Sequence, residues 1–282
     1  MNLIIYILLS LISSMPRILR LFLGRQLGTL IYLVGLRKKV AAINIKIAFP
    51  ELGKLDIELL LLKCYKHFGM VFMDFINQIH INKKNLSNTI IMRSKDKKIL
   101  QDANGGIIMS AHFGNWESVL PAIGLNNIKM ETVVREQKNS LANDYYIKLR
   151  SFPNISLIWN KNALKKLYNA ISNKEFIGLA SDQNARTKGI FLPFFEKEAS
   201  FPKGSGIFYS REKCNLFIFL CIMGSDYKYY SFVKSISSDK VNEDDIIHDI
   251  TLKYIKILEN KIKQNPHQYF WFHKKWDKKI YK

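Results

Sequence analysis

Short apolar segments alternate with amphipathic ones through most of this 282-residue chain, and that alternation constrains the fold more than any other feature. The apolar segments predict buried strands, and the 3.6-residue apolar spacing between them predicts helices. Regular alternation of this kind is typical of an α/β domain, with helices flanking a largely parallel central sheet. The expected strands lie at residues 90–92, 106–110, 132–134, 155–158, 177–180 and 216–222, with helices at 140–149 and 163–171, an antiparallel edge at 229–233 and a last helix at 244–263.

One expected strand runs directly into the sequence SAHFGNWE at residues 110–117. The apolar residues 118–123 that follow predict the start of a helix, so the polar residues between lie at the rim of the sheet. Open α/β sheets bind ligands at that kind of edge. A histidine there can serve as a base, and a nearby carboxylate can hold its ring and favour its charged form. The turn therefore predicts a catalytic pair, with Glu117 orienting His112.

The chain carries a large excess of positive charge, +20 from 43 Lys+Arg against 23 Asp+Glu. Such a charge favours a polyanionic partner: nucleic acid, anionic lipid, a phosphorylated substrate or an acidic carrier protein. A non-enzymatic basic protein that binds nucleic acid or membrane is the rival from a different class. That rival leaves the uncharged N-terminus and the His112 turn unexplained. We therefore expect an anionic membrane partner and no nucleic acid.

The N-terminus is apolar and its first charges are arginines. Residues 1–16 carry no charged side chain, Arg17, Arg20 and Arg25 follow, and a second apolar stretch covers 27–36. The basic start and small-residue cleavage site of a signal peptide are both missing, and the first run is shorter than the roughly 20 residues of a full span. We expect residues 1–36 to anchor the chain at the membrane interface, with the catalytic domain at 37–282 on the cytoplasmic side. A buried N-terminal helix of a soluble protein is the alternative.

Neither a metal nor a cofactor is indicated. The three cysteines, Cys64, Cys214 and Cys221, have no metal-ligand or redox spacing, so buried thiols in a reducing compartment are expected. A metallohydrolase needs three or more converging ligands, whereas only His112 and Glu117 stand close together in the sequence.

The sequence HFGNWE at 112–117 resembles the His-x4-Asp/Glu motif of glycerolipid acyltransferases. In its glutamate form it resembles the lauroyl and myristoyl acyltransferases of bacterial lipid A biosynthesis, within that superfamily. Other segments are similar to the same family, in one collinear order over nearly the whole chain. These are Arg37 with Asn44, AFPE at 48–51, VR at 134–135 with KN at 138–139, Arg150, DQ at 182–183, KGIFLPFF at 188–195, PKG at 202–204 and residues 266–275, which end in WFHKK.

This resemblance implies O-acyl transfer at the cytoplasmic face of the bacterial inner membrane. The family takes a fatty acyl group from acyl carrier protein, or in relatives from coenzyme A. It esterifies a hydroxyl on a phosphorylated glycolipid, which in this branch is a lipid A precursor. Another phospholipid or glycolipid is the alternative acceptor.

The resemblance also assigns roles to residues. It implies that His112 deprotonates the attacking hydroxyl without a covalent intermediate, while Glu117 orients His112. Arg150 is the candidate for oxyanion or phosphate contact, and Asp182 could pair with it, because carboxylate–arginine pairing is planar and bidentate.

Four further residues are candidates for substrate binding. Arg135, Lys188 and Gly189 are candidates for binding phosphate. Asn115, in the turn at residues 110–117, is the fourth candidate. The chain departs from the family pattern at Val134, Glu136 and Asn184, and at Lys275, where arginine is usual. Arginine and lysine differ in bidentate anion binding, so these departures concern the substrate more than the reaction class.

Overall fold

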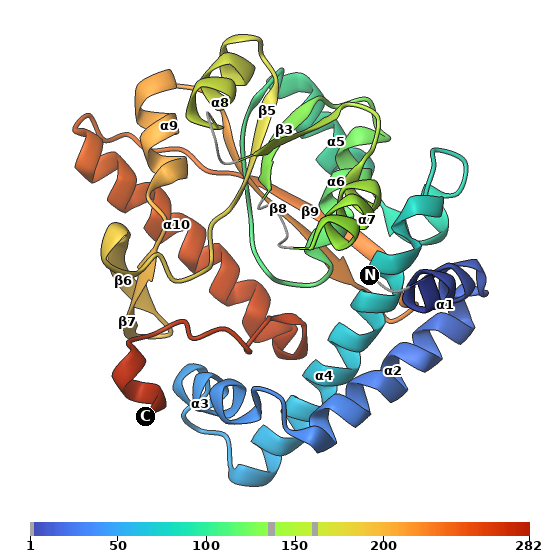
Figure 1. The fold of residues 1–282 in the computed structure, drawn as a ribbon. Helices are drawn as coiled ribbons and strands as arrows, with labels where there is room; N and C mark the ends of the chain where they lie inside the picture. Colours follow the sequence, from blue (N-terminus) through green and yellow to red (C-terminus); the bar gives the residue numbers. More distant parts are fainter. Residues whose placement is uncertain (1–2, 135–138, 160–162) are drawn as a thin grey trace.

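A seven-stranded, mostly parallel sheet organises the structure (Figure 1). The computed structural model describes residues 3–134, 139–159 and 163–282. The strand order is β1-β9-β8-β2-β5-β3-β4, and of the neighbouring pairs only β8–β9 is antiparallel. The strands are β1 (Ile90–Ile91), β2 (Gly106–Ser110), β3 (Met130–Val134), β4 (Ile155–Trp159), β5 (Phe176–Ala180), β8 (Leu216–Met223) and β9 (Tyr229–Ser235). The predicted α/β class is confirmed. The antiparallel strand was expected at the edge, but β1 pairs with its outer side.

Helices cover both faces of this sheet, as the side chains of β2 illustrate. Successive side chains of a strand point to opposite faces. Ile107 and Met109 belong to a core shared with α8 (Ala163–Ser172), α9 (Gly204–Glu212) and α10 (Glu243–Gln264). Ile108 belongs to a second core, shared with α5 (Ser94–Ala103) and α6 (Val119–Gly124). Because both faces are buried, the strands read as continuous apolar runs.

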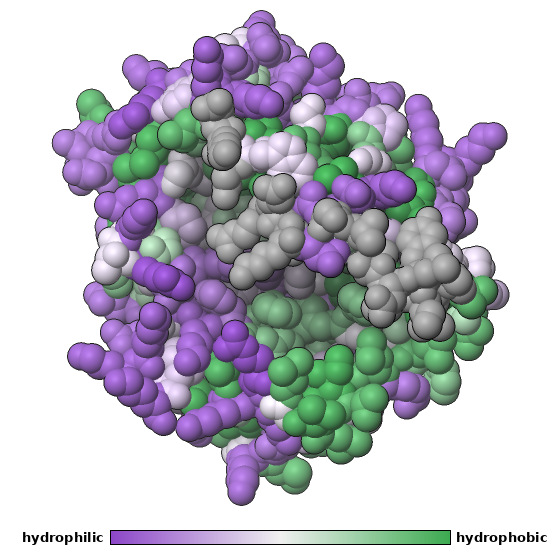
Figure 2. All heavy atoms as spheres, in the orientation of Figure 1, coloured by the Kyte–Doolittle hydropathy of each residue, from purple (hydrophilic) through white to green (hydrophobic). Residues whose placement is uncertain are grey.

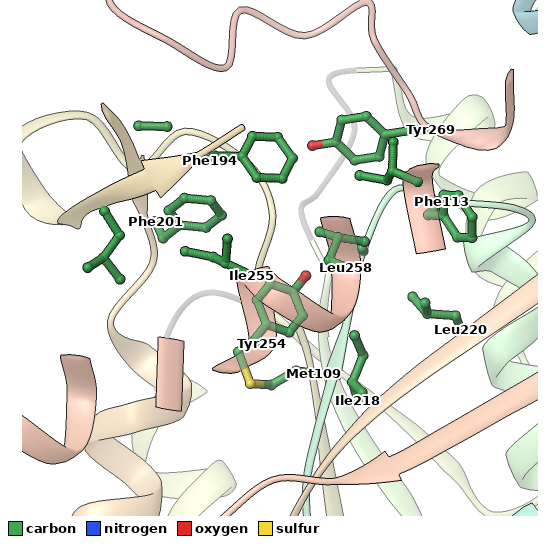
Figure 3. Packing of buried hydrophobic residues seen from close by; sticks show 14 of the residues in the cluster. Met109, Phe113, Phe194, Phe201, Ile218, Leu220, Tyr254, Ile255, Leu258 and Tyr269 are labelled. Atoms are coloured by element: carbon green, nitrogen blue, oxygen red, sulfur yellow. The ribbon is translucent and has the colours of Figure 1, made fainter. Parts of the chain in front are cut away.

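A hairpin and the C-terminal segment extend the first core beyond the sheet. The hairpin consists of β6 (Ile190–Phe194) and β7 (Lys197–Phe201), which pair antiparallel. Phe194 and Phe201 pack beside Ile255 of α10, while Met109 and Ile218 of the sheet face Tyr254 and Leu258 (Figure 3). Short 3-10 helices η5 (Pro266–Gln268) and η6 (Lys278–Tyr281) follow α10.

The N-terminal region forms four helices: α1 (Leu3–Ser14), α2 (Arg17–Val34), α3 (Lys38–Ala48) and α4 (Lys54–Ile76). Helix α2 packs closely against α4, because both helices have glycines where they meet. The two backbones are so close at Gly24, Gly28 and Gly69 that a Cβ would not fit between them. Arg17 adds an ion pair to buried Asp74 of α4 at 2.8 Å. Helix α2 is therefore held to α4 by packing and by charge.

The opposite face of α2 is apolar and exposed. Ile18, Phe22, Leu30, Leu33 and Val34 are between 55% and 85% exposed, and Figure 2 shows apolar surface gathered on the same side of the molecule as α2. Among the described helices, no single one is both long and apolar enough to span a membrane. Only α2 and α3 together pass that test, and they are bent by 96°.

Candidate active site

His112 lies just beyond the carboxyl end of β2, in a loop held by backbone hydrogen bonds. The Gly114 amide donates to the Gln268 carbonyl at 2.8 Å, and the Asn115 amide donates to the Cys221 carbonyl at 2.9 Å. Gly114 has φ +62°, and a Cβ there would collide with that same Cys221 carbonyl. The glycine is therefore required both by the left-handed backbone and by the close approach of β8.

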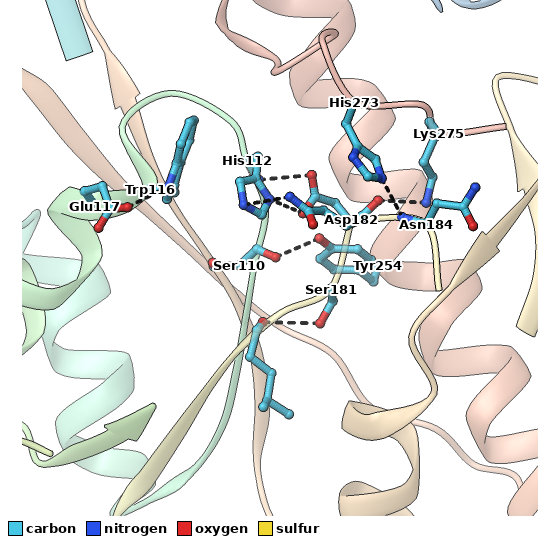
Figure 4. Close-up of polar contacts among 12 residues, drawn as sticks. Ser110, His112, Trp116, Glu117, Ser181, Asp182, Asn184, Tyr254, His273 and Lys275 are labelled. Atoms are coloured by element: carbon cyan, nitrogen blue, oxygen red, sulfur yellow. Dashed lines mark hydrogen bonds and ion pairs between the residues drawn. The ribbon is translucent and has the colours of Figure 1, made fainter. Parts of the chain in front are cut away.

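Asp182 is the hydrogen-bond partner of the His112 ring (Figure 4). Oδ1 lies 2.8 Å from Nδ1, and Oδ2 accepts from the His112 backbone amide at 3.1 Å. The Gln183 side-chain amide lies 3.1 Å from Nε2. Because a carboxylate accepts and an amide N–H donates, Nδ1 carries the proton and Nε2 offers its lone pair. This is the tautomer that a base acting through Nε2 needs.

Glu117 pairs with Arg150 instead of His112. Its Oε2 accepts from Arg150 Nε at 2.7 Å, a second bond joins Arg150 Nη2 to Oε1, and the Trp116 indole N–H donates to Oε1 at 3.0 Å. The predicted pairings, Glu117 with His112 and Asp182 with Arg150, are therefore wrong, because the two carboxylates have exchanged partners.

The register of the sheet explains this exchange. Strands β2 and β5 are adjacent and parallel, with Ser110 opposite Ala180, so residues two positions further on meet at the same edge. Glu117 lies on the 3-10 turn η3 (Trp116–Ser118), which carries its carboxylate toward Arg150 at the end of α7 (Ser140–Arg150).

The environment of His112 favours its protonated form. Burial alone lowers the pKa of His112, but the charge and hydrogen bond of Asp182 outweigh burial, and the net pKa is raised above 6.5. Burial raises the pKa of Asp182, and the charge of His112 reverses this and holds it below its usual value. Asp182 therefore stays ionised and can stabilise an imidazolium.

The side chain of Lys275 holds the backbone of Asp182 in place through hydrogen bonds. Its buried ammonium donates to the carbonyl oxygens of Asp182 at 2.7 Å and of Ser200 at 2.9 Å. It also lies 3.3 Å from the centroid of the Phe201 ring. Burial lowers the pKa of Lys275 to about 7. Residues 266–275, the closing motif of the chain, thus fix the backbone of Asp182 through Lys275.

Asn44 of α3 ties the N-terminal region to this closing motif. Its side-chain amide donates to the carbonyl oxygens of Trp271 at 2.6 Å and His273 at 2.7 Å, and Tyr281 Oη donates back to Asn44 Oδ1 at 2.5 Å. His273 in turn accepts from the Asn184 backbone amide at 3.3 Å (Figure 4). Segments far apart in the sequence therefore meet at the His112–Asp182 pair.

An apolar cleft of about 220 Å³ lies between strands β2, β3 and β5 on one side and η3, α6 and α7 on the other, and its polar lining includes His112, Glu117 and Arg150. Its lining is mostly apolar and comes from β2, β3, β5 and α6. The apolar members are Ile108, Trp116, Val119, Leu120, Met130, Val133, Val134, Leu179 and Ala180. A polar mouth above an apolar interior suits a substrate that has a reactive group at the end of a hydrocarbon chain.

The other predicted site residues lie outside this cleft or outside the described structure. Asn115 is buried and Lys188 is exposed, and neither lines the cleft; the same holds for Gly189, whose hydrogen atoms face Ser200 and Phe201. Arg135 lies outside the described residues. No group of three or more potential metal ligands occurs among the residues that the structure describes.

Sequence reasoning missed Tyr146 and the contact from Gln183. The Arg150 guanidinium carbon lies 3.4 Å from the centroid of the Tyr146 ring, and both residues line the cleft. Residues four apart share one face of a helix, so extending the predicted helix 140–149 by one residue, to Arg150, would have placed this pair on one face.

A histidine held by a buried carboxylate beside an apolar cleft suits an α/β enzyme that uses a base on a substrate with a hydrocarbon chain. Residues 1–278 match the bacterial lipid A biosynthesis acyltransferase family, so the chain belongs to that family and is an acyltransferase. Comparison with curated proteins gave no match.

Proposed function

We propose that this protein transfers a fatty acyl group from acyl carrier protein to a hydroxyl of a lipid A precursor, at the cytoplasmic face of the bacterial inner membrane. The observation that carries the proposal is the position of His112, which lines the apolar cleft and has its Nδ1 bonded to Asp182 at 2.8 Å. Membership of the lipid A acyltransferase family supports the choice of substrate class.

In the proposed reaction His112 works without a covalent intermediate. Nε2 takes the proton of the acceptor hydroxyl while its oxygen attacks the thioester carbonyl. The resulting tetrahedral adduct collapses with cleavage of the carbon–sulfur bond, and the imidazolium returns the proton to the departing thiolate. Asp182 stabilises the imidazolium between these steps, as a buried carboxylate next to Nδ1 does in other base-catalysed acyl transfers.

Arg150 is proposed to stabilise the oxyanion of the tetrahedral adduct. It lies at the cleft mouth, and its Nη1 atom has no hydrogen-bond partner among the described residues. A fixed donor directed at developing charge in a site without water contributes strongly to catalysis. Glu117 occupies Nε and Nη2, so its proposed role is to position Arg150 and leave Nη1 for the substrate.

The acyl chain is proposed to lie in the cleft, with its end near Gly178 and Met130. A Cβ added at Gly178 would lie 3.0 Å from Met130 Sδ and 3.3 Å from Thr132 Oγ1, which both line the cleft. A side chain at Gly178 therefore has little room, and a larger residue there would displace Met130 or Thr132 in the lining of the cleft. Side chains at this depth would set the preferred chain length.

The remaining candidates stay as proposals about substrate contacts. Arg135, Lys188 and Gly189 are proposed to contact acceptor phosphate, and Asn115 is proposed to act on the substrate through the His112 turn. The net charge of +20 suits an acidic carrier protein and an anionic membrane. Acyl-CoA is the alternative donor.

Mass spectrometry of lipids from cells that lack the gene tests this proposal. We expect lipid A to lose one defined acyl chain, which the wild-type gene restores and a His112→Ala gene does not. An unchanged lipid A with a phospholipid or another glycolipid that lacks a chain would overturn the proposed acceptor in favour of the alternative.

A further inference from the structure

A second cavity, of about 360 Å³, lies next to the loop that carries His112. Two of its lining residues, His67 and Gln268, form hydrogen bonds with Gly114 of that loop. The cavity is open to solvent and is bordered by α2, α4, the turn between β8 and β9, and η5. Its volume falls in the range of small-molecule sites, roughly 300–1,000 Å³. It shares no lining residue with the acyl cleft, so the proposed reaction leaves it without a role.

The cavity is strongly basic. Arg25, Lys63 and Lys66 line it, and no aspartate or glutamate does. None of the three forms an ion pair with a carboxylate of the described residues. Lys63 and Lys66 are three residues apart on α4, so they share one face of that helix. Like charges gathered in a concavity raise the local concentration of anions.

Two histidines add polar groups to the same cavity. His67 is buried and its Nε2 lies 3.3 Å from the Gly114 carbonyl, so Nε2 donates and Nδ1 is left as an acceptor. This Nδ1 has no hydrogen-bond partner among the described residues. The His267 ring lies 5.7 Å from that of His67. An unpartnered acceptor beside three cations suits a ligand that combines negative charge with a hydroxyl group.

The surface next to Arg25 distinguishes a lipid from a water-soluble anion. Ile18 and Phe22 precede Arg25 on the same face of α2, and they are 85% and 55% exposed. Leu33, 73% exposed, continues this face. A basic cavity beside an exposed apolar stripe matches an amphiphile, with its anionic group in the cavity and its chains along the stripe.

We propose that this cavity binds the phosphate headgroup of a phosphorylated lipid, whose acyl chains lie along the exposed stripe of α2. Its identity as the acceptor lipid rests on the proposed function, whereas binding itself does not. His67 and Gln268 link the cavity to Gly114, so the bound headgroup would lie against the loop that holds His112.

Binding of soluble short-chain lipids to the full-length protein tests this proposal. We expect dihexanoyl phosphatidic acid to bind, as measured by titration calorimetry, and dihexanoyl phosphatidylcholine to bind at least about tenfold more weakly. The variant Arg25→Gln/Lys63→Ala/Lys66→Ala should lose about tenfold or more in affinity, because it removes the three cations that line the cavity. Lys63→Ala alone, at an exposed position, keeps the test usable if the triple variant unfolds.

The controls separate this site from its competitors and from the catalytic proposal. Lys165→Ala/Lys166→Ala removes two exposed lysines of α8, and it should bind as the wild type does. His112→Ala should also bind normally, so a failure of acyl transfer leaves the result intact. Equal affinity for inorganic phosphate would overturn the lipid assignment. The proposal would be overturned if the triple variant and Lys63→Ala kept their lipid affinity. Loss of acyl carrier protein binding in the same variants would assign the cavity to the carrier.

Discussion

Asp182 and Glu117 are both buried carboxylates, but they face different cations and should respond differently to substitution. Asp182 holds His112 and Glu117 holds Arg150. In the proposed reaction the first pair governs a proton that moves, and the second governs a positive charge that stays in place. Their roles can therefore be separated by pH and by stability.

The Asp182–His112 pair should set the pH dependence of acyl transfer. The base must be neutral, so activity should rise with pH through the pKa of His112, which lies above 6.5. Asp182→Asn removes the charge that raises this pKa. We expect the inflection of kcat/KM to move to lower pH and the rate to fall by roughly 10²–10⁴-fold. Asp226→Asn, at an exposed aspartate, should leave the profile unchanged, and an unshifted inflection in Asp182→Asn would refute the pairing.

The same pair has a consequence for folding. A histidine whose pKa is raised in the folded state stabilises the fold fully below its unfolded pKa, and this contribution is lost as pH rises through the folded pKa. We therefore expect the wild type to lose stability relative to His112→Gln as pH rises from about 6 across that range. Urea unfolding at several pH values measures this. A difference that does not vary with pH would contradict the raised pKa of His112.

The Glu117–Arg150 pair should matter for stability as well as catalysis. Removing one partner of a buried ion pair leaves an uncompensated charge, at a cost of about 3–5 kcal/mol. We expect that loss in the free energy of unfolding of Glu117→Ala, with partial recovery in Glu117→Ala/Arg150→Met. Glu243→Ala breaks the exposed pair with Arg211 and should cost about 1 kcal/mol or less. Equal losses in Glu117→Ala and Glu243→Ala would argue against a structural role for the buried pair.

At the scale of elements, the sequence predicted most strands and the position of His112, but not its partner. Apolar runs identify strands because both faces of this sheet are buried. The order of the strands depends on tertiary packing, and β2 lies between β8 and β5, which come from distant parts of the chain. The proximity of Asp182 to His112 follows from that order. The short sequence distance between His112 and Glu117 suggested a contact that the 3-10 turn prevents.

The apolar cleft should select among acyl chains by their length. Gly178→Val places a side chain against Met130 and Thr132, so we expect a preference for shorter chains, by about tenfold. Met130→Ala should shift the preference toward longer chains. Competition among acyl donors, read by mass spectrometry, measures both. Gly204→Ala, where a Cβ meets nothing within 4 Å, is the control. The same chain preference in all four proteins would exclude this cleft as the acyl site.

At the scale of the whole molecule, the exposed stripe of α2 should determine membrane association. Ile18→Glu/Phe22→Glu/Leu33→Glu places charge where we expect lipid, so co-sedimentation with anionic vesicles should fall by about tenfold or more. Val241→Glu changes a residue that is 95% exposed in a loop, and it should have no effect. Deleting residues 1–36 is a weaker test, because it also removes the packing of α2 on α4. Undiminished sedimentation of the stripe variant would contradict the anchor.

Whole-chain features could be predicted from the sequence to different degrees. Collinear motifs identified the family, since they extend along the chain as the match over residues 1–278 does. The basic cavity could not be predicted, because Arg25, Lys63 and His267 come from separate elements that only packing brings together. Chain length could not be predicted for the same reason, because β2, β3, β5 and α6 all contribute to the cleft.

Acyl transfer by the purified protein tests the central claim, that His112 is the base, most directly. Acyl carrier protein loaded with fatty acid and a lipid A precursor are incubated with wild type and with His112→Gln, and the lipid product is measured by mass spectrometry. Both proteins should be folded at the pH of the assay, as cooperative thermal unfolding shows, and only the wild type should add an acyl chain. A folded His112→Gln protein that acylates the precursor at the wild-type rate would contradict the account.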